Sequence, residues 1–297
     1  GELVAAVPEE VAEELEDLLA EAESLEDMAI DIGASSAEEA INEYHIRIGE
    51  PVVPDVDLEY DEKHEVLIGK AFDCRLGCAA IVDTMKQVAG EDLAVNVVGA
   101  FATQEEMGTR GATVTSQTVA PDLAIVFEGC PADDTFSEGY MIQTALKKGP
   151  MFRHMDISAI CAPRYQRWAL DLAAKKGIPV QESVREGGGN NAASIQTALV
   201  GAPSIVEGIP VRYAHATDCI SAEHDYEAGV QMPVLLFQLG LQVGLDALAG
   251  GFGAKVEEQR HQHGGLGGLL GDHAIVIPVA QGGGIVRAEP VTAAGAV

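Results

Sequence analysis

The stretch from Leu93 to Ala112 most constrains the fold, because a long apolar segment in it runs straight into two acidic residues. Its first part, Leu93 to Thr103, is rich in Val and Ala and predicts a strand buried on both faces. Glu105 and Glu106 follow, and a turn from Gly108 to Gly111 closes the stretch. Neighbouring side chains of an extended segment point in opposite directions, so one glutamate can face a metal ion and the other the solvent or substrate. Taken alone, such a pair is more often a solvated strand end.

From Lys70 onward, apolar strands alternate with helices, which is typical of an α/β fold with a mostly parallel sheet flanked by helices. Ligands of such sheets gather at the carboxyl ends of the strands. A strand over 123–127 ends in Glu128, and Asp73 stands at the entrance of a helix predicted over 76–88. The sequence therefore predicts several carboxylates at one edge of the sheet. Helices are also expected over 163–176 and 192–199, and strands over 178–184 and 208–216.

The first 69 residues have a different pattern. Residues 1–26 predict an acidic amphipathic helix, and strands are expected over 27–36 and 46–54, with a short capped helix starting at Ser36. We therefore expect a small, mainly β module over 1–69, an α/β domain over 70–239 and a Gly-rich extension over 240–297. The extension carries three histidines, but glycine on this scale opposes ordered packing, so a flexible segment is favoured over a metal site.

Composition narrows the class of protein. The chain has 297 residues with 47 acidic against 18 basic side chains, a net charge of −29, which argues against nucleic acid as a partner. Its five cysteines are scattered and odd in number, as expected of reduced thiols in the cytosol. No apolar run approaches the ~18–20 residues that cross a bilayer, so we expect no membrane partner and a cytoplasmic location.

The strand-end acids and one late histidine form a candidate metal centre. Carboxylates can bridge two ions and imidazole supplies a nitrogen ligand, and two ions about 3.5–4 Å apart can activate a water between them. Each residue alone has a simpler interpretation, since Asp73 is equally suited to cap a helix and an isolated His215 is more often a hydrogen-bonded histidine. The candidate residues are Asp73, Glu105, Glu106, Glu128 and His215.

Five segments together resemble metallopeptidase family 42, the glutamyl and deblocking aminopeptidases, a family that also includes endoglucanase-like proteins. They are GKAFDCRLGCA, QEEMGTRGA, PDLAIVFEG, REGGGNNAASI and IPVRYAHA, in the family's order between about Asp27 and Leu236. The resemblance implies an α/β catalytic domain of the co-catalytic dizinc aminopeptidase type with a small, β-rich, PDZ-like dimerisation domain, of which residues 1–69 would be the latter part.

The resemblance also implies a role for each site residue. Asp73 would bridge two divalent ions, zinc or cobalt, with Glu106 and His215 on one ion and Glu128 on the other. Glu105 would be the general acid and base. Substrate-binding roles are implied for Gly188, Gly189, Asn190, Asn191 and Arg212.

Three departures from the family pattern affect the expected activity. The family has a further metal-binding histidine in an H-x-D motif, but the first histidine here is His45, and the chain opens with Gly1. We therefore expect an N-terminally incomplete sequence that binds at most one ion well and has little peptidase activity. Asn191 stands where the family usually has Asp, and Cys74 stands where it commonly has Asn.

The expected function is a metal-dependent aminopeptidase that removes N-terminal residues from short peptides and assembles as dimers into a dodecamer, as the resemblance implies. One alternative is a catalytically impaired fragment or scaffold subunit of the same fold. Another is a related two-metal deacylase or carboxypeptidase. The acidic pair at 105–106 does not separate these enzymes, but QEEMGTRGA together with RYAHA favours the aminopeptidase.

Overall fold

The computed structural model describes residues 30–239, 273–277 and 284–287. The chain divides into two compact units, 1–53 and 54–297, which are described separately. In the first unit, Ser36 caps helix α2 (Ala37–Asn42) by accepting a hydrogen bond from the Glu39 amide, as the sequence predicts. The predicted strands over 27–36 and 46–54 are absent from the described residues of this unit, and the predicted helix over 1–26 lies outside them.

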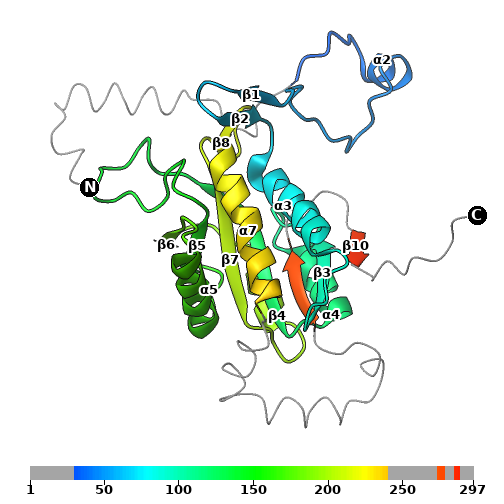
Figure 1. Ribbon diagram of the computed structural model, residues 1–297. Coiled ribbons are helices and arrows are strands. Elements are labelled where there is room, and N and C mark those ends of the chain that lie inside the picture. Colours follow the sequence, from blue (N-terminus) through cyan, green and yellow to red (C-terminus); the bar gives the residue numbers. More distant parts are fainter. Residues whose placement is uncertain (1–29, 240–272, 278–283, 288–297) are drawn as a thin grey trace, which may run out of the picture. The chain divides into compact units, whose positions relative to one another are not determined.

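The second unit is built on a seven-stranded sheet with the order β10-β3-β9-β4-β7-β5-β6 (Figure 1). Four of its ladders are parallel, and those of β10 with β3 and of β5 with β7 are antiparallel, which confirms the mostly parallel α/β fold. Its strands are β3 (Asn96–Phe101), β4 (Leu123–Pro131), β5 (Met151–Met155), β6 (Gln181–Val184), β7 (Ser204–Val211), β9 (His273–Ile277) and β10 (Gly284–Arg287).

Helices cover both faces of this sheet (Figure 1). Alternate residues of β4 point to opposite faces, so Ile125 joins a core with α3, α5 and α7, whereas Val126 joins one with α4 and α6. Both cores are needed because the central strands β4 and β7 carry apolar side chains on both of their faces. The helices are α3 (Phe72–Val88), α4 (Arg110–Val119), α5 (Pro163–Lys176), α6 (Ala192–Thr197) and α7 (Glu223–Gln238).

A second, three-stranded sheet joins β1 (Glu59–Asp61), β2 (Val66–Gly69) and β8 (Cys219–Ala222). Because β2 pairs with β8, residues 54–69 belong to the same compact unit as the large sheet, whereas the sequence placed the boundary at residue 69. The expected extension over 240–297 also contributes β9 and β10 to the large sheet. The side chains of His261 and His263 lie outside the described residues.

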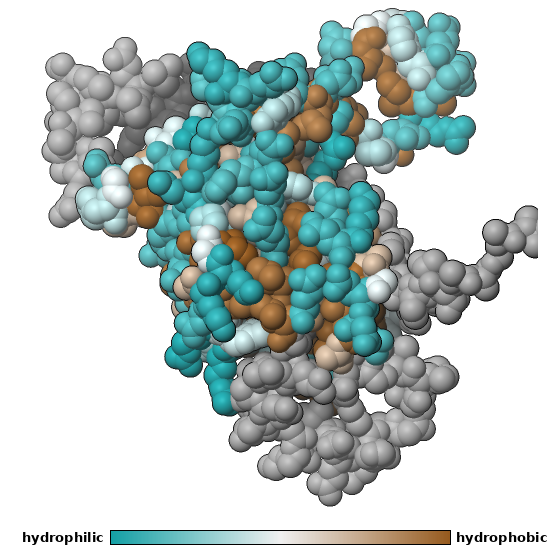
Figure 2. Space-filling view, viewed as in Figure 1, coloured by the Kyte–Doolittle hydropathy of each residue, from teal (hydrophilic) through white to brown (hydrophobic). Residues whose placement is uncertain are grey.

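The surface is mostly hydrophilic on the face drawn in Figure 2, with hydrophobic residues emerging in the centre of that face. This agrees with the strongly acidic composition of the chain. Among the residues that the structure describes, no helix has both the length and the apolar character that crossing a membrane requires.

Candidate functional site

A cleft of about 780 Å³ lies in the second unit, at the carboxyl ends of several strands. Its lining contains eight of the ten residues singled out from the sequence. These are Asp73, Glu105, Glu106, Glu128, Gly188, Gly189, Asn190 and His215.

Glu105 and Glu106 reach the cleft from a turn, not from an extended strand. β3 ends at Phe101, so the predicted alternation of the two glutamates along a strand is wrong. The turn is held by backbone bonds from the amides of Gly108 to Glu105 O (2.8 Å) and of Gly111 to Thr103 O (2.8 Å). A Cβ at Gly111 would lie 2.4 Å from that same Thr103 oxygen, so only glycine allows this closure.

Asp73 is placed by the start of α3, where the backbone of Asp73 and Cys74 is not helical and the peptide bond between them is cis. The helix assignment begins before Asp73, with Ala71 as its N-cap, and the side chain of Asp73 bonds to the Gly129 amide and to His215. Asp73 accepts a hydrogen bond from the Gly129 amide, and a Cβ on Gly129 would come within 2.5 Å of the Asp73 Cα. This close approach of α3 to β4 brings Asp73 beside Glu128.

His215 follows β7 in a loop where its own φ is 65° and that of Tyr213 is 59°. Its Nε2 lies 2.9 Å from Asp73 Oδ2 and 3.3 Å from Glu106 Oε1. The histidine is therefore part of a cluster and is not an isolated core residue. We call Asp73, Glu105, Glu106, Glu128 and His215 the acidic cluster.

Ligand atoms of the acidic cluster, together with the sulfur of Cys74, fall into two overlapping groups, which we call the first and the second ligand group. Among the described residues, Asp73, Glu106 and His215 place one ligand atom each within 4.8 Å of one another, and so do Asp73, Cys74 and Glu128. Asp73 belongs to both groups. Oxygen and nitrogen atoms gathered in this way are the donors that transition-metal ions prefer in proteins.

The electrostatics of the cluster also fit a bound cation. Burial first, and then Glu106 and Asp73, raise the pKa of Glu105 to about 7. Burial and the neighbouring Asp73 raise the pKa of Glu128 well above its usual value, and its buried Oε1 has no hydrogen-bond partner in the described part of the chain. Carboxylates that crowd together in a buried place are unfavourable as anions unless a positive charge joins them.

The pKa of His215 is raised as well, but for an imidazole this favours the charged form. Burial lowers the pKa of its imidazole, but the negative charges of Glu106 and Asp73 outweigh that effect and raise it overall. Asp73 itself has a raised pKa because of burial and the nearby Glu106. The residues of both groups therefore suit divalent metal ions.

Two arginines that the sequence analysis did not single out also line the cleft, together with Ser158 and Asn190. Arg153 donates from Nη1 to Asp156 Oδ2 at 2.9 Å, and Asn190 Nδ2 donates to the same oxygen at 2.7 Å. The other oxygen of Asp156 accepts from the amide and hydroxyl of Ser158, both at 2.7 Å. We call Arg153, Asp156, Ser158, Arg185 and Asn190 the arginine cluster.

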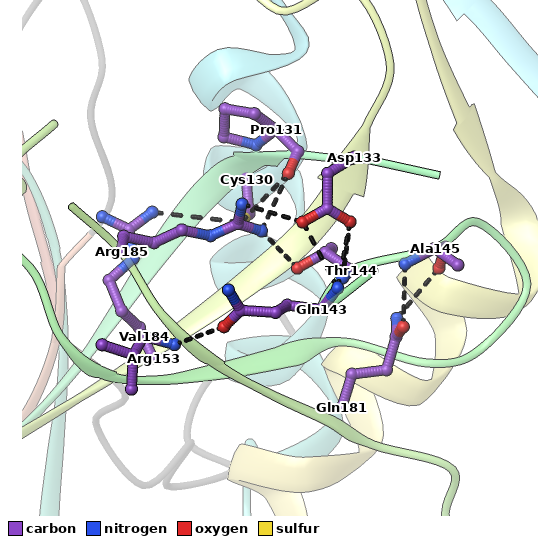
Figure 3. A network of polar contacts seen from close by, with 10 residues as sticks. All are labelled: Cys130, Pro131, Asp133, Gln143, Thr144, Ala145, Arg153, Gln181, Val184 and Arg185. Carbon is purple, nitrogen blue, oxygen red and sulfur yellow. Dashed lines mark hydrogen bonds and ion pairs between the residues drawn. The ribbon is translucent and has the colours of Figure 1, made fainter. Parts of the chain in front are cut away.

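Arg185 extends this cluster into a hydrogen-bond network (Figure 3). Its guanidinium donates to Asp133 Oδ2 at 3.2 Å, to the Pro131 carbonyl at 3.1 Å and to the Thr144 hydroxyl. Asp133 in turn accepts from the Thr144 amide at 2.9 Å. Arg185 stands directly after β6, so the strand-end rule that led to the acids could have found it as well.

Two residues that the resemblance implied as substrate-binding are not among the residues that line the cleft in the described part of the chain. Arg212 donates from Nε and Nη2 to the two oxygens of Asp134, at 2.9 and 2.7 Å, so its guanidinium is already paired. Asn191 is fully buried at the start of α6, and neither atom of its amide group has a hydrogen-bond partner.

Similarity to known proteins agrees with this geometry. The profile of the M42 glutamyl aminopeptidase family matches residues 4–232. The chain belongs to this family. An Acetivibrio thermocellus relative of this M42 chain is 34% identical over 210 residues, which are 71% of this chain and 62% of the relative. The glutamyl aminopeptidase of Lactococcus lactis is 29% identical over 203 residues, which are 68% of this chain and 56% of that enzyme.

Solved structures are similar too. The TET aminopeptidase of the marine sediment archaeon Thaumarchaeota archaeon SCGC AB-539-E09 has a TM-score of 0.66 and 30% identity, and the match covers 79% of this chain and 64% of that one. The M42 chain thus spans roughly three fifths of the length of the curated relatives that it matches, 62% and 56% for the two above.

Proposed function

We propose that the cleft hydrolyses the first peptide bond of short peptides, as an aminopeptidase with two divalent metal ions, zinc or cobalt. The observation that carries this proposal is the pair of overlapping ligand groups that share Asp73 beside Glu105. Asp73, Glu106 and His215 would hold one ion. Asp73 and Glu128 would contribute to holding the other, although this group contains no histidine, which is why the sequence led us to expect that only one ion binds well. When bound, such ions lower the pKa of water and polarise the carbonyl of the scissile bond.

Glu105 is suited to move the proton in this reaction. It lines the cleft, belongs to neither ligand group, and has a pKa of about 7 because of burial and the neighbouring acids. A carboxylate of that pKa can take a proton from the attacking water and give it to the leaving amine near neutral pH. The loop of three glycines at 187–189 lines the cleft without side chains and leaves room for a peptide backbone.

The test is hydrolysis of leucyl- and glutamyl-p-nitroanilide by zinc- or cobalt-loaded protein, beside the same substrates with an acetylated amine. An aminopeptidase releases p-nitroaniline only from the substrates with a free amine. A deacylase would release acetate from the acetylated substrates without p-nitroaniline, and a carboxypeptidase would cleave neither kind, because both lack a free carboxylate. Glu105→Gln should lower turnover about a hundredfold or more with the metal content unchanged, because the general base is lost. The exposed Glu91→Gln is the matched control and should keep full activity. Near-normal turnover of Glu105→Gln would remove Glu105 from the mechanism.

Self-association is a further part of this proposal. None of the residues 30–53 is buried within the described part of the first unit, and Ile48 is fully exposed there while the side chains of Val52 and Val53 are about two-thirds exposed. These exposed apolar side chains are close together in the sequence, and this supports a surface that another chain covers. Light scattering on the purified protein should give a mass of several chains, up to the expected dodecamer, and a monomer at all concentrations would contradict this part.

A further inference from the structure

The thiol of Cys74 lies within the second ligand group. Its sulfur and one oxygen each of Asp73 and Glu128 are all within 4.8 Å of one another. Cys74 and Glu128 are almost fully buried, at 4% and 5% exposure, and Asp73 is half-buried. Asp73 and Glu128 line the cleft, whereas Cys74 lies behind them and is not among the lining residues of the described chain. The non-helical backbone at Asp73 (φ −86°, ψ 105°) and Cys74 (φ −120°, ψ 49°) allows these adjacent residues to serve the same site.

Glu128 provides a second, independent observation. Its Oε1 is buried and accepts no hydrogen bond from any residue that the structure describes. A buried carboxylate oxygen without a donor costs free energy unless a proton or a cation satisfies it. Together with Asp73 and Cys74, Glu128 offers two carboxylates and one thiol, which are ligand types that zinc binds in proteins.

We propose that Cys74 is a metal ligand, whose sulfur binds the second divalent ion of the cleft together with Asp73 and Glu128. The inference rests on the proposed function in one respect, since it takes Asp73 to be shared between two ions. On binding, the S–H bond breaks, its proton leaves to the solvent, and a sulfur–metal bond forms without any change of oxidation state. The hydrogen bond that Cys74 Sγ now donates to the Phe127 carbonyl at 3.5 Å is given up.

This arrangement makes the two ion sites chemically different. The site of Asp73, Glu106 and His215 offers oxygen and nitrogen, whereas the site of Cys74 offers a soft thiolate. Thiolate favours zinc and cadmium, and sites of oxygen alone favour magnesium or manganese. We therefore expect the second site to take zinc or cadmium and to discriminate against magnesium.

Absorption spectroscopy tests the inference without an activity assay. Metal-free protein is titrated with Co²⁺ and, separately, with Cd²⁺, while the near-ultraviolet thiolate-to-metal charge-transfer band and the bound metal are both measured. The band should grow as the second ion binds and should be absent from Cys74→Ser and Cys74→Ala. Cys78→Ser is the matched control, because this partly exposed thiol lies one turn further along α3, and it should keep the band.

Affinity gives a second readout. Loss of an outer-shell partner of a metal site typically costs about 10–100-fold in affinity, so loss of the sulfur should weaken the second ion by at least that factor. Cys74→Asp should restore much of this affinity without restoring the band. A purely packing role of the thiol would leave both the affinity and the spectrum unchanged in Cys74→Ala.

The outcomes separate the two proposals. Two bound ions and peptidase activity without a thiolate band in the wild-type protein would overturn the role of Cys74 and leave the proposed function standing. Failure to bind any ion would overturn both. Because the wild-type spectrum at full occupancy decides the matter, the inference stays falsifiable even if the substituted proteins fail to fold.

Discussion

The acidic cluster and the arginine cluster line the same cleft, but they differ in how completely their charges are paired. In the arginine cluster, both oxygens of Asp156 accept hydrogen bonds, and each guanidinium has an ion-pair partner although its Nε atom has no hydrogen bond among the described residues. In the acidic cluster, Glu128 keeps a buried oxygen without a partner in the described part of the chain, and its pKa is raised by burial and by the nearby Asp73.

The difference indicates that the two clusters have different roles. Removing one partner of a buried ion pair leaves the other charge uncompensated and destabilises the fold, so we expect the arginine cluster to act as a scaffold for the cleft. Crowded, unpaired carboxylates destabilise the fold, and such groups are concentrated at functional sites. Substitutions in the acidic cluster should therefore affect ions and turnover, and substitutions in the arginine cluster should affect stability.

The largest effect is expected for Asp73→Ala. Asp73 belongs to both ligand groups, so its loss should release both ions and abolish peptidase activity. The metal-free protein should not become less stable, because burial and Glu106 raise the pKa of Asp73 and make its charge unfavourable in the folded state. Elemental analysis and denaturant unfolding of the metal-free protein measure the two quantities. Retention of both ions would contradict the sharing of Asp73.

Asp156→Ala should show the reverse pattern. Its removal leaves the buried Arg153 without its ion-pair partner, which typically costs about 3–5 kcal/mol in the free energy of unfolding. The exposed Asp171→Ala on α5 is the control and should change stability by less than about 0.5 kcal/mol. Urea unfolding measures both. A loss below about 1 kcal/mol for Asp156→Ala would mean that the arginine cluster is not a scaffold.

The pH dependence of this effect has a definite sign. Burial opposes the charge of Asp156, but the hydrogen bonds from Arg153 and Ser158 prevail and hold the pKa of the carboxyl below its usual value. In the unfolded chain an aspartate has a pKa of about 3.9. The contribution of Asp156 to stability is therefore complete above that pH and is lost as the pH falls through its lower pKa in the folded state. The stability difference between the wild type and Asp156→Ala should therefore shrink in acid. A difference that grows below about pH 4 would contradict this.

Glu207 lies outside both clusters, and its substitution should have a smaller effect than those of Asp73 and Asp156. It is fully buried in β7, and neither of its carboxylate oxygens has a partner among the described residues. Burial raises its pKa well above the usual value, as for Glu128. However, it belongs to neither ligand group found among the described residues and does not line the cleft. An unpaired buried carboxylate alone therefore does not identify a metal site. The ligand atoms around it determine whether an ion can bind there.

Glu207→Leu should accordingly leave ion binding unchanged but alter the pH dependence of stability. In the wild type the folded chain keeps this proton while the unfolded chain releases it near about pH 4.3, so stability falls as the pH rises between the two pKa values. The stability of Glu207→Leu relative to the wild type should thus rise with pH, by up to about 1.4 kcal/mol per pH unit. Unfolding at a series of pH values measures it, and a difference independent of pH would contradict the raised pKa.

The sequence predicts the fold and the acids of the site better than it predicts the short strands and the pairing of side chains. Long helices with clear ends are predicted well, as in α5, which spans the predicted residues and ends at Gly177 with φ 70°. The acids of the site can be predicted because parallel strands end at the same edge of the sheet. Glu128 was identified as the residue at such a strand end. The short strands expected at 27–36 and 46–54 fail in the described residues, since such segments depend on partners that no local pattern reveals.

Side-chain pairing was beyond the reach of the sequence. The Arg212 guanidinium turns to Asp134, 78 positions away along the chain, and this pairing could not be seen in the motif around His215. Arg153 lies in the middle of β5 directly after Met151 and Phe152, where a buried arginine is an unusual signal that would have justified a search for a buried acid. Cys74 was noted only as a departure from a family pattern, although the fold places its sulfur in a ligand group.

Anomalous X-ray diffraction from crystals of the zinc-loaded protein tests most directly whether the acidic cluster is a two-ion centre. We predict one anomalous peak within bonding distance of Asp73, Glu106 and His215, and a second one beside Asp73, Cys74 and Glu128, with no peak at the arginine cluster. Zinc at neither ligand group, in crystals that bind zinc elsewhere on the chain, would contradict the centre and with it the proposed aminopeptidase.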